Sequence, residues 1–113
     1  MAAFMLIFRG QQPEASPEQM QQTMKKWLAW FKELGDNGHI KYPGHPLQGT
    51  GKVVSGKQKI VHDGPYAEAK DVVNGFTLIN AKDLAQAVEL SKGCPILEAG
   101  GSVEVRPVQI LDM

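Results

Sequence analysis

The segment from Lys59 to Phe76 holds most of the side chains that could do chemistry in this 113-residue chain. His62 and Asp63 stand where a β-branched run ends, directly before a Gly-Pro pair. Such a pair restricts the backbone on both sides, so we expect a stiff turn that fixes the Asp63 carboxylate and the Tyr66 ring. The carboxylate could act as a general acid or base, and the tyrosine hydroxyl could donate to a substrate oxygen. The alternative is that Asp63 only forms the turn, as aspartate commonly does.

Three histidines offer a proton-transfer partner for Asp63. Histidine side chains ionise near neutral pH, so a His–Asp pair suits acid–base catalysis. His62 is adjacent, but neighbouring residues of a strand point to opposite faces. His39 and His45 lie in a predicted loop, from which either could reach the carboxylate within one chain or across a dimer; otherwise both are ordinary loop histidines. The catalytic candidates are Asp63, His62 and His45. His39, His45 and His62 could also form a metal site with Asp63 or Glu68, but their spacing matches no recognised metal-ligand motif, so we predict neither a metal nor a cofactor.

Four further residues are candidates for binding a substrate: Tyr66, Lys70, Phe76 and Arg9. Gly75 suggests a pocket floor or a close approach of backbone, and Phe76, Tyr66 and Trp30 would surround that pocket. Arg9 and Lys70 could bind an anion together near the sheet. The alternative is that both are surface cations, whose long side chains lie along apolar surface without binding anything.

Composition excludes several classes of function. Lys+Arg and Asp+Glu balance at 12 each, which argues against electrostatic binding of nucleic acid or of an anionic membrane. Apolar residues make up 42% of the chain, enough for a core, but no apolar run reaches the roughly 18 residues of a membrane span. Cys94, the only cysteine, cannot form an internal disulfide, which fits a cytoplasmic protein. Because Cys94 follows a predicted helix, whose dipole disfavours a thiolate there, we expect a packed thiol.

The first strand is predicted near the N-terminus and is apolar on both faces. Phe4, Leu6 and Phe8 point one way, and Met5 and Ile7 point the other. Both faces should therefore be covered. We expect two helices to cover one face and a second copy of the sheet to cover the other, which predicts a homodimer.

A long helix is predicted to start at Ser16 and to close at Gly35 or Gly38. Ser16 is the N-cap, Pro17 takes the first helical position, and Gln19 completes a capping box. An apolar stripe at helical spacing should face the core. It comprises Met20, Met24, Trp27, Leu28, Phe31 and Leu34.

The second half predicts a loop, a hairpin, a strand, a helix and a final strand, in that order. The expected bounds are 38–51, 53–61, 71–80, 81–92 and 102–110. Asn80 should cap the helix, with Leu84, Ala85 and Val88 on its buried side. Pro107 cannot donate to a ladder, so the last strand should lie at the sheet edge.

The order of elements is thus β-α-β-β-α-β, with the second β element elaborated into a hairpin. This is the ferredoxin-like split βαβ pattern, an α+β fold with an antiparallel sheet and two helices on one face. We expect a single domain over residues 1–113.

Several motifs resemble those of the YCII-related protein family, in particular the branch named after its Asp-Gly-Pro-Phe (DGPF) motif. They are Asp63-Gly64-Pro65-Tyr66, Ala67-Glu68-Ala69-Lys70, Asn74-Gly75-Phe76, and the segments 4–10, 92–95 and 103–107. Tyr66 stands where the branch usually has phenylalanine. The resemblance implies a ferredoxin-like domain of the dimeric α/β-barrel type. An Asp–His pair near a cleft is suggested for some relatives, and Asp63 occupies the motif position.

Two readings of function follow. The first is a small-molecule enzyme with an Asp/His acid–base site in a pocket between sheet and helices. The second is a non-catalytic dimer that binds a ligand or regulates a partner, since the resemblance includes relatives associated with alternative sigma factors. Fold alone does not decide between them, because this fold carries many functions.

Overall fold

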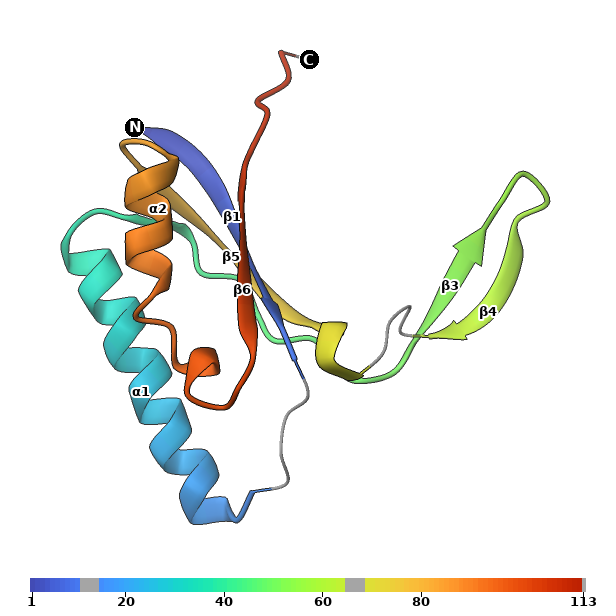
Figure 1. Ribbon diagram of the computed structural model, residues 1–113, viewed down its shortest axis with the longest axis horizontal. Helices are drawn as coiled ribbons and strands as arrows, with labels where there is room; N and C mark the ends of the chain where they lie inside the picture. Colours follow the sequence, from blue (N-terminus) through green and yellow to red (C-terminus); the bar gives the residue numbers. More distant parts are fainter. Residues whose placement is uncertain (11–14, 65–68, 113) are drawn as a thin grey trace.

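The chain forms a four-stranded antiparallel sheet with two helices on one face, and a separate two-stranded hairpin (Figure 1). The computed structural model describes residues 1–10, 15–64 and 69–112. The strands and helices are β1 (Ala2–Arg9), α1 (Pro17–Asp36), β2 (Ile40–Tyr42), β3 (Gly51–Ser55), β4 (Ile60–Gly64), β5 (Val73–Ala81), α2 (Leu84–Ser91) and β6 (Ser102–Pro107). Single 3₁₀ turns follow β4 and α2, at Ala69–Asp71 and Pro95–Leu97.

The strand order of the main sheet is β2-β5-β1-β6, with every pair antiparallel. With β1 and β5 in the centre and the two helical connections on one face, this is the ferredoxin-like arrangement. The predicted fold class is therefore confirmed. The expectation that β6 lies at an edge also holds.

The second strand of the sheet is not where the sequence predicted it. β2 lies inside the segment expected to be a loop, and the predicted hairpin β3–β4 forms a sheet of its own. Backbone bonds around His39 explain the difference. The His39 N–H donates to the Leu34 carbonyl at the end of α1, and the His39 carbonyl accepts from Asn80 N–H at 2.7 Å. These bonds hold the next residue, Ile40, beside β5 and against the core.

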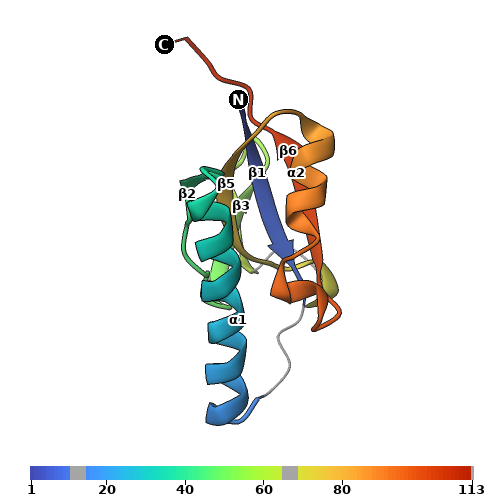
Figure 2. The ribbon, with the colours of Figure 1, turned by 90° about the vertical axis from the view of Figure 1, so that its left-hand side faces the viewer.

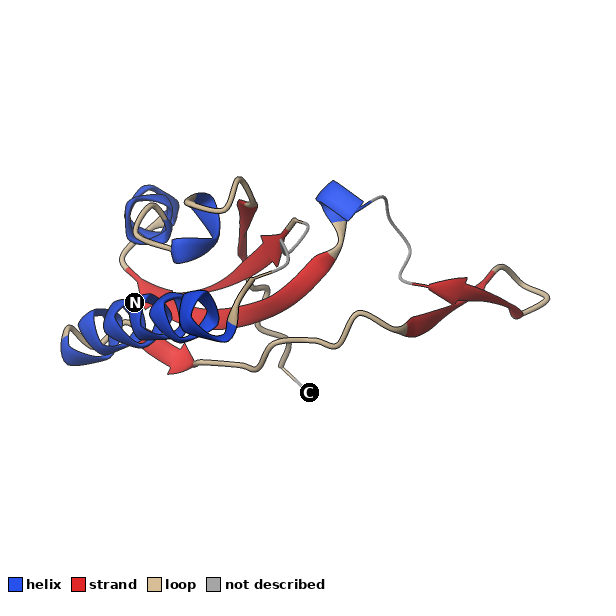
Figure 3. Ribbon diagram, turned by 90° about the horizontal axis from the view of Figure 1, so that it is seen from below, coloured by secondary structure: helices blue, strands red, loops and turns tan. Residues whose placement is uncertain are grey.

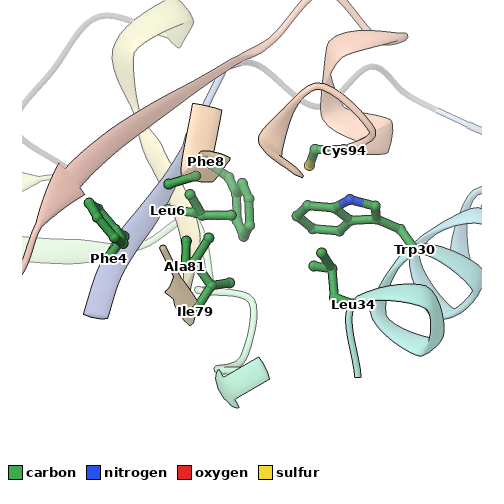
Figure 4. Close-up of a cluster of buried hydrophobic side chains, with 9 residues drawn as sticks. Phe4, Leu6, Phe8, Trp30, Leu34, Ile79, Ala81 and Cys94 are labelled. Carbon is green, nitrogen blue, oxygen red and sulfur yellow. The ribbon is translucent and has the colours of Figure 1, made fainter. Parts of the chain in front are cut away.

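β1 shows the predicted alternation. Phe4, Leu6 and Phe8 are buried beneath the helices (Figure 4), and Leu6 is completely inaccessible. Met5 and Ile7 lie on the opposite face and are half-buried. Full burial of one leucine side chain contributes about 1.5–3 kcal/mol, so this row is a main source of stability.

α1 begins at the predicted capping box and ends at Asp36, with Asn37 as its C-cap, directly before Gly38. The Ser16 side chain accepts from the Gln19 N–H, and the Gln19 side chain accepts from the Ser16 N–H. The predicted core stripe is only partly buried. Leu34 is buried, whereas Met20, Met24 and Leu28 are exposed. Trp30, expected beside a pocket, instead lies buried in the core. The reason is that the first turns of α1 extend beyond the end of the sheet (Figure 2), where no strand lies beneath them.

α2 starts three residues later than predicted because β5 continues to Ala81. Asp83 is the N-cap, and its side chain accepts from the Gln86 N–H at 2.8 Å. The helix buries Ala87 and Ser91. The residues predicted to be buried, Leu84, Ala85 and Val88, are instead exposed, since the face that packs on the sheet carries Ala87 and Ser91.

The hairpin of residues 51–64, called the arm below, gives the chain an angular outline. The overall extents are 46 × 46 × 19 Å. The radius of gyration is 15.7 Å, against about 13 Å for a compact domain of this length. Figure 3 shows the arm reaching away from the sheet and both helices.

Candidate functional site

A cavity of about 500 Å³ lies between α1, the helix-facing side of the sheet and the segment that follows β2. This volume falls in the range of sites for small organic ligands. The lining is mostly apolar and comprises Phe8, Ala15, Met20, Thr23, Met24, Trp27, Phe31, Pro43, Gly44, His45, Pro46, Asn74, Gly75, Phe76, Thr77, Pro95, Ile96, Ala99 and Gly101. Among these residues, His45 is the only one with a side chain of a type that ionises near neutral pH.

One wall of the cavity is the segment 43–46, which packs directly on β5. Pro46 bridges to Gly75, and a Cβ placed on Gly75 would lie 3.2 Å from the His45 carbonyl oxygen. The Thr77 hydroxyl, completely buried, donates to the Pro43 carbonyl at 2.8 Å. Gly75 thus allows both features expected of it, a close backbone approach and a place in the cavity lining.

The opposite wall is aromatic. The rings of Phe8 and Trp27 meet edge to face, with centroids 5.0 Å apart and planes at 80°. Phe31 packs on Trp27 at 5.8 Å. Met20 and Met24 from the exposed turns of α1 extend this wall, and methionine side chains adapt to different ligand shapes. The wall can therefore hold a flat apolar molecule.

His45 lies at the edge of this cavity, near a second aromatic group. Its ring centroid is 6.5 Å from that of Tyr42, and the Tyr42 and Phe76 rings are 6.1 Å apart. Phe76, a predicted substrate-binding residue, also lines the cavity, although as the register partner of Ile7 it directs its side chain to the sheet face opposite to the helices. His45 and Phe76 are thus the two predicted site residues that the fold brings together.

The other two catalytic candidates lie on the arm. Asp63 is exposed and forms an ion pair with Lys52 on the neighbouring strand. His62, which precedes Asp63 in β4, pairs with Val53. Its side chain therefore points to the face of the hairpin opposite to that of Asp63. Neither residue is among those that line the cavity in this single chain. Tyr66 falls outside the described residues.

Arg9 and Lys70 differ in their surroundings. Arg9 donates through Nε to the Glu104 carboxylate at 3.1 Å and through Nη1 to the Asp71 carbonyl at 2.8 Å. These bonds join β1, β6 and the 3₁₀ turn before β5. Lys70, in that turn, is exposed. An anion at Arg9 would have to compete with the Glu104 carboxylate.

His39 and Cys94 have structural surroundings. The His39 Nδ1 lies 2.8 Å from the Asn80 carbonyl oxygen, next to the backbone bonds that hold β2. Cys94 is buried in the core, and burial raises the pKa of its thiol from 9.0 to about 12, although a backbone hydrogen bond at Ile96 opposes this. A thiol in this state is a weak nucleophile at neutral pH. Cys94 therefore acts as a packed core residue.

Two findings concern the described part of the chain as a whole. Within residues 1–10, 15–64 and 69–112, no group of three His, Cys, Asp or Glu side chains is placed to hold a metal ion. None of the helices in the same ranges has the length and apolar character needed to cross a membrane.

Sequence reasoning missed most of the cavity wall. Phe8, Met20, Met24, Trp27 and Phe31 read as core positions because their spacing is that of a buried helical stripe and strand face. The available signal was length. A 20-residue helix is about 30 Å long, whereas the eight-residue β1 spans about 26 Å, so the helix is long enough for one end of the stripe to extend past the strands.

Comparisons with known proteins agree with the fold. The family model described as YCII-related domain matches residues 3–111. Among the solved structures, 5-chloro-2-hydroxyhydroquinone dehydrochlorinase from Burkholderia phenoliruptrix, in complex with 2,5-dihydroxybenzoquinone, superposes with a TM-score of 0.54. The two chains are 19% identical, and the match covers 94% of this chain and 93% of that one. No curated protein sequence gives a significant match.

Proposed function

Because the chain belongs to the YCII-related family, we propose that it is a homodimeric enzyme that binds a small organic substrate in the cavity between α1 and the sheet. The observation that carries the proposal is the cavity itself. About 500 Å³ of mostly apolar space has His45, a proton-transfer group, in its lining.

The proposed substrate is a flat, hydroxylated ring compound of one or two rings. Edge-to-face aromatic walls at Phe8, Trp27 and Phe31 favour a flat molecule. An apolar pocket with one polar edge favours a ligand that carries a polar group on one side. The dehydrochlorinase of similar fold, solved with a dihydroxybenzoquinone, supports this class.

In the proposed reaction His45 moves a proton to or from the polar group of the bound ring. The apolar walls exclude water around the substrate, which strengthens the electrostatic effect of His45 on a developing charge. Asp63 remains the proposed second acid–base group, and His62 and Lys70 remain weaker candidates. For Asp63 to take part, its carboxylate must leave Lys52 and meet the cavity of its own chain or of a second copy.

The test uses the fact that the chain has three histidines. Their ring protons give three separate nuclear magnetic resonance signals, which His39→Gln, His45→Gln and His62→Gln assign one by one. We titrate the full chain with 2,5-dihydroxybenzoquinone, hydroquinone and 2-naphthol. Binding in the cavity should move the His45 signal and quench tryptophan fluorescence, because Trp27 is in the wall.

The matched comparison is His45→Gln against His39→Gln. His45→Gln should abolish turnover of any probe that the wild type converts, while the fold stays intact. His39→Gln should bind and convert the same probe, since His39 faces the Asn80 carbonyl and not the cavity. Binding without turnover of any ring compound by the wild type would favour the non-catalytic reading. If no ring compound moves the His45 signal, both the proposed site and the proposed substrate class are wrong.

A further inference from the structure

The arm is a two-stranded sheet that carries apolar side chains without a core of its own. Val54, Ile60 and Val61 are 64%, 50% and 61% exposed. Val54 and Val61 are register partners, so they form one apolar patch on one side of the arm. An isolated hairpin is only marginally stable in water, and it gains stability by packing on another surface.

The arm leaves the body on the side of the sheet opposite to the helices (Figures 1 and 3). That side, called the open face below, has an apolar centre. Met5 pairs with Leu78, and Ile7 pairs with Phe76, and all four side chains are half-buried in the single chain. The arm and the open face therefore stand at an angle to each other on the same side of the sheet, and both carry apolar side chains.

A second copy of this chain fits the angle better than an unrelated partner because the open face is self-complementary. Its rim on β6 carries Glu104 opposite Ile7 and Arg106 opposite Met5. When two identical faces meet about a two-fold axis, the same patch must match itself. A patch with an apolar centre and both signs of charge on one rim meets that condition. Within each chain Glu104 pairs with Arg9 at 3.0 Å and lies 3.9 Å from Arg106, so an ion pair of Arg106 with the Glu104 of the other copy would extend this charge network.

The length of the arm fits the same partner. Each arm strand has five residues, about 17 Å at a rise of roughly 3.4 Å per residue. Two sheets packed face to face lie about 10 Å apart. An arm on the open-face side is thus long enough to pass the whole thickness of the gap and to lie against the second sheet.

We propose that the arm is a clasp that grips a second copy seated on the open face. The patch of Val54 and Val61 packs on that copy, and the two-fold axis makes the contact reciprocal. This inference rests on the homodimer of the proposed function. Phe76 belongs both to the open face and to the cavity lining, but His45 is not part of the clasp. It assigns a role to a segment that adds nothing to the core of its own chain.

The experiment compares association of four full-length chains by sedimentation velocity over about 0.1–100 μM. They are the wild type, the arm variant Val54→Ser/Val61→Ser, the chain with residues 52–63 replaced by a Gly-Ser linker, and the control Leu28→Ser/Leu84→Ser. The control residues are 60% and 47% exposed but lie on the helices, away from the open face. Circular dichroism and thermal unfolding verify the fold of each chain.

The wild type should be dimeric at micromolar concentration. Both arm variants should dissociate at least about tenfold more readily, as expected when buried apolar contacts of an interface are truncated. The control should associate like the wild type. Arm variants that dimerise with wild-type affinity overturn the clasp, and so does a wild type that is monomeric at 100 μM.

The His45 titration separates this result from the proposed function. If the arm variants dissociate while no ring compound moves the His45 signal, the clasp stands and the cavity proposal fails. If the arm variants dimerise with wild-type affinity while ring compounds still move the His45 signal, the clasp fails and the cavity proposal stands.

Discussion

Replacement of Gly44 by alanine should detach the cavity wall from the sheet. Gly44 has a φ of +72°, and a Cβ at this position would overlap the carbonyl oxygen of Phe76, which is fixed in β5. Side chains rarely adopt such a φ, and a strand backbone cannot move aside. The segment 43–46 must therefore shift away from β5.

Gly38→Ala is the matched control. Gly38 has a nearly equal φ of +77°, but nothing lies within 4 Å of its added Cβ. The two variants share the conformational cost of alanine at positive φ, about 1–2 kcal/mol. They differ in the clash alone.

The additional cost at Gly44 comes from hydrogen bonds that the shifted segment breaks. The Thr77 hydroxyl would lose the Pro43 carbonyl inside the core, which costs about 1–3 kcal/mol for an unsatisfied buried group. The Leu47 N–H would lose the Asn74 carbonyl, worth about 1 kcal/mol. We therefore expect Gly44→Ala to lower the free energy of unfolding by about 3–6 kcal/mol.

Urea denaturation followed by tryptophan fluorescence measures both losses under the same conditions. If Gly44→Ala still folds, its affinity for ring compounds should also fall, because the segment that carries His45 has moved. Equal destabilisation by the two substitutions would contradict the reasoning, since it would mean that the contact between this segment and β5 contributes nothing.

Two further predictions concern the helix start and the buried thiol. Ser16→Ala should lower the free energy of unfolding by about 1 kcal/mol because the Gln19 N–H loses its acceptor. Ser16→Thr should keep most of this stability because threonine also has a hydroxyl group. An unchanged urea midpoint for the alanine variant would refute the capping role. Burial raises the pKa of Cys94 to about 12, so the folded thiol keeps its proton while the unfolded one releases it above pH 9.0. Under reducing conditions the free energy of unfolding should therefore fall by about 2 kcal/mol more in the wild type than in Cys94→Ala between pH 8 and pH 10.5. An equal loss of unfolding free energy in the two proteins between these pH values, measured by urea denaturation, would show that the folded thiol is not protected from ionisation.

Local signals in the sequence predicted the central elements well. The alternation of β1 and the Ser16 capping box depend on neighbouring residues alone, and both appear as expected. The position of β2 could not be predicted in this way. Three residues are too few for a periodic pattern, and Ile40 is held by bonds to partners far along the chain.

The candidate site was predicted in part for the same reason. Gly75 and Phe76 sit on a strand with a clear pattern, and both line the cavity. The Asp-Gly-Pro turn made Asp63 and His62 site candidates. Local sequence does not reveal that β4 pairs with β3 alone, in a sheet separate from the one beside the cavity. The aromatic wall went unrecognised because a buried stripe and a pocket wall have the same residue types and spacing.

Both edges of the main sheet discourage a further strand from adding to it. β2 has only three residues and an irregular register at Ile40 and Tyr42, while β6 ends in Pro107, which has no N–H. A strand from another molecule would find few regularly spaced donors and acceptors at either edge. Growth of the sheet into filaments is therefore hindered, even when the protein is crowded.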